Sequence, residues 1–379
     1  MHDEEGFLKL DSANITINCG AAQCSTGIRS VGPMYVSGGD LSIEFGEAEE
    51  AYGIETSIHY VYDQDTSDLI TFNRGHLSFT DDAKVKITAD EIITDAYGIK
   101  CDGDLTANKA ELDITTGSGY DEVISSDGMM VPKATSVPII VFGYAKFMSC
   151  KVDTLSLCGG GENIMGGKSE IQDETTGETI KYGGYIEIYD GAEISIKCED
   201  SGFNRFGMQS TNNITINGGK LTIEMGKITG DFPIRRCYGM HSGFHIYING
   251  GTTSISVPER VLEHDDFSCI SQWYGGVHLS DNITVTGEKG EFINGGGGCI
   301  QDDPKVPVVF TDEKVSEGLL GDADMDGQLN VKDATAIQKF IAGLIDFTEE
   351  QKALADFNGD GDINVKDATA IQKRIAGLI

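Results

Sequence analysis

The sequence predicts a mainly β protein, a parallel β-helix followed by a small all-α module, and three observations support this prediction. Strand-like alternation of apolar residues recurs in one register across the first three hundred residues. Glycine occupies 49 of the 379 positions and proline only 7, which indicates many tight turns in a chain that is not of low complexity. A duplicated segment with helical periodicity ends the chain.

The β-helix prediction rests on segments that align on a glycine followed by an aliphatic residue. The five anchor glycines are Gly27, Gly98, Gly207, Gly239 and Gly276. Apolar residues stand seven and nine positions after each anchor, and a turn follows at position eleven. This alternation is typical of β-strands.

A single coil of two or three short strands cannot bury its apolar side, so we expect successive coils to stack. The anchors are 32 residues apart from Gly207 to Gly239 and 37 apart from Gly239 to Gly276, which indicates variable loops between coils. A β-propeller is the alternative, but its constant repeat of about 40–45 residues is absent. A two-sheet sandwich would repeat strands every ~8–12 residues without this anchor spacing.

The charge of the chain excludes some function classes. The 28 basic and 61 acidic side chains leave a net charge of -33, which repels phosphate backbones, so we expect no nucleic-acid partner. Acidic residues at ligand spacing would instead bind divalent cations such as Ca²⁺. No stretch approaches the ~20 apolar residues of a membrane span. The start of the chain lacks the features of a secretory signal, so we expect a mature or truncated N-terminus.

The cysteines do not form a recognisable metal or redox motif. Their odd number, nine, and the lack of a C-x-x-C pair argue against a zinc ribbon or a thioredoxin-type site. We expect most of them to be small buried residues. One or two disulfides remain an alternative.

The C-terminal repeat is the clearest pattern in the chain. Residues 322–345 and 356–379 are identical at 18 of 24 places. Each copy has oxygen-bearing side chains at loop positions one, three and five, a glycine at six and a carboxylate at twelve, as a calcium loop requires. Position seven would bind through its backbone carbonyl, and position nine directly or through water.

We therefore predict two Ca²⁺ sites, one in each copy. The predicted ligands are Asp322, Asp324, Asp326, Gln328, Asn330 and Asp333 in the first loop, and Asp356, Asn358, Asp360, Asp362, Asn364 and Asp367 in the second. Both loops end in Asp where ordinary EF-hands have Glu, and no amphipathic helix precedes the first loop. Each copy is thus half an EF-hand, a loop followed by a helix.

The helix after each loop carries one apolar stripe. The stripes comprise Val331, Ala334, Ile337, Ile341 and Leu344, and Val365, Ala368, Ile371, Ile375 and Leu378. Neither helix can bury its stripe alone, so we expect the copies to pack together with approximate twofold symmetry. Because so small a core needs the folding energy of bound metal, we expect the module to unfold without calcium.

The duplicated pattern D-x-[DN]-x-D-G-x-x-N-x-x-D, followed by an apolar helix, resembles a type I dockerin over residues 321–379. The resemblance implies two loop-helix F-hand repeats that bind a cohesin module of a scaffoldin, and so a secreted, extracellular protein of a cellulosome. It also implies a cohesin-binding surface at Val331, Lys332, Gln338, Lys339, Val365, Lys366, Gln372 and Lys373. Because the copies agree at these places, a two-way binding mode is implied.

Two questions about the dockerin-like segment stay open, the identity of its cohesin and whether it docks at all. The Val-Lys pair differs from the small hydroxylated pair of the best-known clostridial dockerins, which leaves the cohesin unidentified. A calcium site that only stabilises a C-terminal cap is the alternative, although stability alone does not explain identical exposed positions in both copies.

The N-terminal part, over roughly residues 12–300, is similar to a family of cellulosomal carbohydrate-binding proteins with a right-handed parallel β-helix of pectate-lyase-like fold. The line GMQSTNNITINGGKLTI from Gly207 to Ile223 carries the resemblance. It implies binding of cellulose or pectic polymers and calcium sites on the β-helix. Pectate-lyase-type enzymes are the second group that it resembles.

A lyase acting on uronates needs a cation for the carboxylate and a base, often Arg or Lys. The candidates are Arg205, Arg235 and Arg236, which lie near Asp200 and Asp231 in the sequence. Such arginines are more often in ion pairs, and no residues have catalytic spacing, so we expect no catalytic residues.

Exposed aromatic rings that stack on sugars are the usual means of polysaccharide binding. The only tryptophan, Trp273, stands beside Tyr274 between two coils, and we predict that this pair binds the ligand. The negative charge would repel pectin unless calcium bridges the carboxylates, so it favours a calcium-dependent mode or a neutral glucan.

The sequence thus predicts a β-helix over residues 1–310, a linker over 311–320 and a dockerin over 321–379. The predicted function is non-catalytic binding of plant cell-wall polysaccharide. A polysaccharide lyase and a cell-surface adhesin remain as alternatives.

Overall fold

The computed structural model describes most of the chain in two units. The described residues are 7–62, 69–73, 75–118, 122–124, 130–132, 135–157, 161–172, 179–201, 204–229, 235–262, 265–289, 295–312, 321–325, 329–358 and 361–375. One compact unit comprises residues 1–281 and 285–310, and the other residues 282–284 and 311–379. The predicted linker falls mostly on residues 313–320, which lie outside the described residues.

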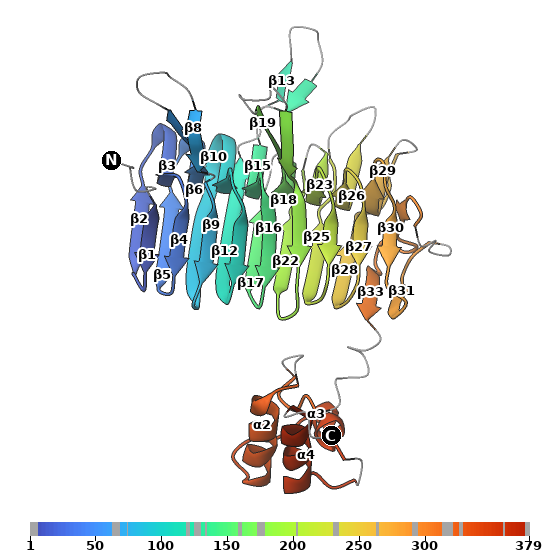
Figure 1. Ribbon diagram of the computed structural model, residues 1–379. Coiled ribbons are helices and arrows are strands. Elements are labelled where there is room, and N and C mark those ends of the chain that lie inside the picture. Colours follow the sequence, from blue (N-terminus) through green and yellow to red (C-terminus); the bar gives the residue numbers. More distant parts are fainter. Residues whose placement is uncertain are drawn as a thin grey trace. The chain divides into compact units, whose positions relative to one another are not determined.

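The first unit is a stack of coils that contribute strands to three faces (Figure 1). The first face is a nine-stranded parallel sheet. In order, its strands are β1 (Leu8–Asp11), β4 (Met34–Ser37), β9 (Leu77–Thr80), β11 (Leu105–Asn108), β16 (Tyr144–Met148), β21 (Tyr185–Ile188), β24 (Ile214–Ile216), β27 (Ile246–Ile248) and β30 (Val277–Leu279).

The second face is also parallel from its first strand to β28. Its strands are β2 (Ile15–Cys19), β5 (Asp40–Phe45), the first half of β10 (Ala83–Cys101), β12 (Ala110–Ser118), β17 (Lys151–Ser156), β22 (Glu193–Cys198), β25 (Lys220–Met225) and β28 (Thr252–Ser256), with β33 (Val308–Asp312) paired to β28 and β31 (Ile283–Thr286) paired to β33.

The third face contains parallel strands that end at β29, to which one short strand pairs antiparallel. The strands are β3 (Ala22–Val31), β6 (Ala48–Ser57), the second half of β10, β15 (Thr135–Val141), β18 (Gly161–Gly166), β23 (Arg205–Ser210), β26 (Arg236–Ser242), β29 (Asp266–Gln272) and the short β32 (Gly298–Cys299).

Three antiparallel hairpins are inserted between these strands and project on one side of the coils (Figure 1). They are β7 (His59–Tyr62) with β8 (Leu69–Asn73), β13 (Glu122–Ile124) with β14 (Met130–Pro132), and β19 (Lys168–Gln172) with β20 (Thr179–Gly183). The sequence prediction of variable loops between coils is therefore confirmed.

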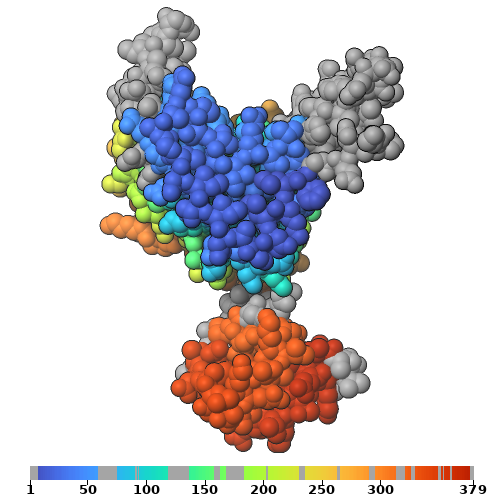
Figure 2. Space-filling model, turned by 90° about the vertical axis from the view of Figure 1, so that its left-hand side faces the viewer, coloured from blue at the N-terminus to red at the C-terminus, as the bar shows by residue number. Residues whose placement is uncertain are grey.

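The core forms because alternate residues of each strand point inward and meet their register partners in the next coil. On the third face, one inward row runs through Ile54, Ile99, Ile139, Ile164, Met208, Met240 and Ile270, all fully buried. At the N-terminal end, which faces the viewer in Figure 2, Ile15 and Ile17 are only half-buried. The predicted parallel β-helix is confirmed by this row-by-row stacking.

Four of the five predicted anchors lie in the third face, but the fifth was wrong. Val277 pairs with Ile246 in the first face, whereas Met240 pairs with Ile270. Ile270, which continues the row of Met240, is preceded by cysteine and not by glycine, so the Gly-aliphatic pattern does not mark it. The Gly276-Val277 pair fits the pattern but lies at another corner of the coil. The coil at Ile54 was missed because a hairpin separates it from the next strand of its coil.

The second unit contains three helices, α2 (Val331–Ile341), α3 (Glu349–Ala355) and α4 (Val365–Ile375). α2 and α4 pack against each other. The small core comprises Ala323, Ala334, Ala336, Ile337, Phe347, Ala355, Ala368 and Ile371. The described helices contain no segment that is long and apolar enough to span a membrane.

The predicted apolar stripes are buried only at their centres. Ala334 and Ile337 are buried, but Val331 is 63% and Leu344 73% exposed. Ile341, Val365 and Ile375 are exposed in the same way, and Leu378 lies outside the described residues. The buried positions of α2 and α4 lie toward the N-terminal ends of these helices, next to the loops. Leu344 follows the end of α2.

We predict that Gly53→Ala destabilises the β-helix by about 1–3 kcal/mol, because an added methyl group overpacks the coil. Its Cβ would lie 2.3 Å from the backbone carbonyl oxygen of Gly98 and 2.7 Å from Ile87 Cγ2. Urea unfolding followed by the fluorescence of Trp273 measures this change. Gly20→Ala is the control, since its Cβ would meet nothing within 4 Å. Equal stability of the two variants would contradict the close stacking of these coils.

Candidate functional site

The first C-terminal loop gathers three carboxylates at its centre. Asp322, Asp324 and Asp333 each offer an oxygen, and these oxygens lie within 4.8 Å of one another. Asp333 is fully buried and Asp322 is 4% exposed. Asp333 Oδ1 accepts from the backbone N–H of Asp324 at 3.3 Å, and Oδ2 from that of Asn330 at 2.7 Å. Asp333, the predicted last ligand of the loop, therefore also holds the loop against the start of its helix.

The second loop repeats this arrangement. Asp367 is fully buried, and its Oδ1 and Oδ2 accept from the backbone N–H groups of Asn358 at 3.1 Å and Asn364 at 2.9 Å. Asp356 Oδ2 accepts from the N–H of Gly361 at 2.9 Å. The same two hydrogen bonds at position twelve in both copies show that the sequence repeat is a structural repeat.

The asparagines at position nine begin the helices. Oδ1 of Asn330 accepts from the N–H of Lys332 at 2.9 Å, and Oδ1 of Asn364 accepts from the N–H of Lys366 at 2.9 Å. These bonds satisfy N–H groups that the first turn of a helix leaves without partners. The loop pattern predicted these asparagines only as metal ligands, and their capping role emerges from the structure.

Not all predicted ligands can be placed. Asp326, Gln328 and Asp360 lie outside the described residues. Asp362 lies on the exposed side of the second loop, and its backbone carbonyl accepts from Asn364 Nδ2 at 2.8 Å.

The donor set of the first loop fits a hard divalent cation. Carboxylate oxygens are the ligands that calcium prefers, and a buried group of like charges is costly unless a cation balances it. Burial is the main cause that raises the pKa of Asp333, and the nearby Asp322 carboxylate adds to it. Calcium would supply the missing positive charge.

Residues 320–376 match the family model of the dockerin type I domain. The C-terminal segment is a type I dockerin. Dockerins bind calcium and attach proteins to cellulosomes through cohesins, so the acidic cluster and the loop-helix repeat have a common explanation. No curated protein and no solved structure matches the chain.

The residues predicted to bind cohesin are all on the surface of the dockerin. Val331, Lys332, Gln338, Lys339, Val365, Lys366, Gln372 and Lys373 are exposed. They lie on α2 and α4 at equivalent positions of the two copies, beside the loops. Their role in cohesin binding stays a prediction.

One helix of the dockerin was not predicted from the sequence. α3 precedes the second loop and begins with a capping box, in which Thr348 Oγ1 accepts from the N–H of Gln351 at 3.2 Å and Gln351 Oε1 accepts from the N–H of Thr348 at 3.1 Å. The Thr-x-x-Gln signal was available in the sequence.

Two of the three arginines considered for lyase chemistry have structural roles. Arg205 is 1% exposed, and its guanidinium donates to Ser156 Oγ at 2.9 Å inside the β-helix. Arg235 is buried and paired with Asp265, and the Arg235 guanidinium holds the pKa of that carboxyl at about 2. Neither can reach a substrate. Arg236 is exposed, and Asp231 lies outside the described residues.

The cysteines are not activated nucleophiles in the described part of the chain. Eight are described there and all are free; six of them are buried, and Cys158 lies outside the described residues. Burial raises the pKa of Cys101 and of Cys150 to about 12, so these thiols stay protonated at neutral pH. The prediction of small buried cysteines is confirmed for most of them.

Trp273 and Tyr274 form an exposed aromatic surface after β29. Trp273 is 65% and Tyr274 81% exposed, and Phe244, 45% exposed, lies 6.2 Å from Tyr274 between ring centroids. The backbone N–H groups of Trp273 and Tyr274 donate to Ser242 and Gly243 carbonyls at 3.1 and 3.3 Å. The backbone of this loop is thus held to the preceding coil, and its rings form an exposed aromatic platform.

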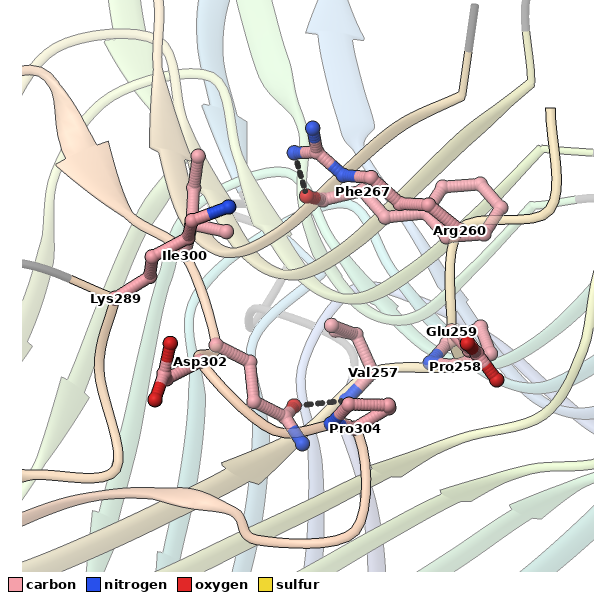
Figure 3. A pocket seen from close by; sticks show the side chains of 10 residues that line it. Val257, Pro258, Glu259, Arg260, Phe267, Lys289, Ile300, Asp302 and Pro304 are labelled. Atoms are coloured by element: carbon pink, nitrogen blue, oxygen red, sulfur yellow. Dashed lines mark hydrogen bonds between the residues drawn. The ribbon is translucent and has the colours of Figure 1, made fainter. Parts of the chain in front are cut away.

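A cavity of about 310 Å³ lies near the C-terminal end of the β-helix unit (Figure 3). Arg260 donates to the carbonyl oxygen of Phe267 at 2.6 Å at its edge, and Lys289 and Asp302 line the opposite side (Figure 3). Phe267 is only 2% exposed. The cavity offers no open aromatic face and carries both signs of charge, so it lacks the features expected of a sugar site.

We predict that a calcium chelator removes the helical signal of the dockerin and that added calcium restores it. Asp367→Asn is expected to raise the calcium concentration needed for half of this signal at least tenfold, because one buried carboxylate is lost. Circular dichroism at 222 nm during a calcium titration measures both effects. Asp346→Asn, at an exposed position between the helices, is the matched control. Full helical signal in the presence of chelator would contradict the prediction.

Proposed function

We propose that this protein binds plant cell-wall polysaccharide through its β-helix, without degrading it, and is held on a scaffoldin by its dockerin. The dockerin supports an extracellular, cellulosome-associated protein. The aromatic platform of Trp273, Tyr274 and Phe244 is the observation that supports polysaccharide binding, because open rings offer apolar faces to the C–H groups of sugars.

We further propose that the dockerin holds two calcium ions, one in each loop. The first loop brings three carboxylate oxygens together, and the second repeats its hydrogen bonds at position twelve. With both loops ordered, α2 and α4 present equivalent exposed Val-Lys and Gln-Lys pairs to a cohesin. Either copy then supplies the same docking face.

A polysaccharide lyase has less support than a binding protein. Arg205 and Arg235, two of the three arginines considered as bases, are buried and engaged in hydrogen bonds inside the unit. A cell-surface adhesin would use the same exposed surface. It differs from the proposed function in its target, which would be a cell and not a polysaccharide.

We predict that Lys332→Glu and Lys366→Glu each weaken cohesin binding by less than threefold, because the other copy still presents its face. The double variant is expected to weaken binding at least a hundredfold. Surface plasmon resonance on an immobilised cohesin measures the affinities, with Lys352→Glu on α3 as the control. A large loss in either single variant would contradict the two-way mode.

We predict that the protein sediments with insoluble cellulose or pectin gel and releases no soluble sugar. Trp273→Ala is expected to lower the bound fraction at least tenfold, because the larger platform ring is removed. Tyr35→Ala, an exposed aromatic on β4 that is 42% exposed, is the matched control. Release of unsaturated uronates would favour the lyase, and binding to cells but not to polysaccharide would favour the adhesin.

A further inference from the structure

Two neighbouring side chains that point outward from the third face have buried polar atoms without a hydrogen-bond partner. Gln209 on β23 and His241 on β26 are register partners in adjacent parallel strands. Six buried side-chain polar atoms in the described residues lack a hydrogen-bond partner, and three of them are Gln209 Oε1, His241 Nδ1 and His241 Nε2. Such atoms are rare in folded proteins, so half of them on two adjacent residues points to a missing partner molecule.

Aromatic rings surround His241. Phe206, Tyr238 and Trp273 have ring centroids 5.7, 5.1 and 4.8 Å from its imidazole. His241 is 1% and Tyr238 6% exposed, whereas Trp273 is 65% exposed. The hydroxyl of Tyr238 donates to Asp266 and is therefore occupied. Because Trp273 is the most exposed of the three rings, rotation of its indole is the simplest way to make the ring nitrogens of His241 accessible to a ligand.

We propose that Gln209 and His241 form the hydrogen-bonding floor of the polysaccharide site beneath Trp273, and that this floor selects a neutral glycan. The proposal rests on the proposed polysaccharide binding and names the ligand class of that site. Trp273 and Tyr274 would stack on the sugar rings while the floor binds hydroxyl groups.

The chemistry of the three open atoms identifies the ligand class. Burial lowers the pKa of His241 to about 4, so at neutral pH its imidazole has one N–H donor and one acceptor nitrogen. Gln209 Oε1 is a second acceptor. The ligand must therefore supply at least two donors and one acceptor. Sugar hydroxyls provide both. A uronate also carries hydroxyls, but its carboxylate can only accept, and it would bring a negative charge close to Asp266, which accepts from Tyr238, in a chain whose net charge is -33.

The test is the affinity of the full-length chain for soluble oligosaccharides. The probes are hexasaccharides of β-linked glucose, xylose and mannose, and a hexagalacturonate, and the fluorescence of Trp273, the only tryptophan, reports binding. We expect a neutral hexasaccharide to bind and to shift this fluorescence. His241→Phe and Gln209→Leu are each expected to weaken binding about tenfold or more, and Tyr35→Ala to leave it unchanged.

The outcomes separate this proposal from the proposed function. Unchanged affinity in both floor variants, with Trp273→Ala no longer sedimenting with insoluble polysaccharide, would overturn the floor and keep polysaccharide binding. No binding of any polysaccharide by the wild type would overturn the proposed function itself. Preference for the hexagalacturonate would overturn the neutral class. Both floor variants should melt at or above the wild-type temperature; lower melting together with lost binding would assign the residues a structural role and overturn the proposal.

Discussion

The buried carboxylate at position twelve of each dockerin loop is the group on which the C-terminal unit depends. Asp333 and Asp367 accept two backbone N–H groups each and so close the loop onto the start of its helix. In the first loop, the same carboxylate lies within 4.8 Å of two others. A cation that balances this charge would also order the loop, so calcium, helix position and the proposed docking surface would be coupled through this carboxylate.

The β-helix raises a different question, since the proposed sugar site lies on a repetitive surface. Inward rows of Ile and Met are constrained by the next coil, so variation is confined to outward rows and corners. The platform at Trp273 occupies such a corner, and Gln209 and His241 occupy an outward row beside it. The stacked coils position these outward side chains, and the proposed function uses residues that the core does not.

Much of the dockerin could be predicted from sequence, because its predicted ligands lie within twelve consecutive residues and occur twice. The β-helix was predicted as a class, but its register was predicted only where glycine marked the coil. Ile139, Ile164 and Ile270 follow Pro, Asn and Cys, so their rows emerged only from strand pairing. Arg205 could not be recognised as an internal residue, since that depends on which face its strand joins. The pairing of Gln209 with His241, 32 residues apart in sequence, has no local signal at all.

The most direct test of the account is the number of calcium ions that the full-length chain binds. Isothermal titration calorimetry would compare the wild type with the Asp333→Asn/Asp367→Asn double variant, so that any sites on the β-helix cancel. The account predicts that the wild type binds two more ions at high affinity than the variant and that only the wild type then binds cohesin. Equal calcium binding and equal cohesin affinity in the two proteins would contradict it.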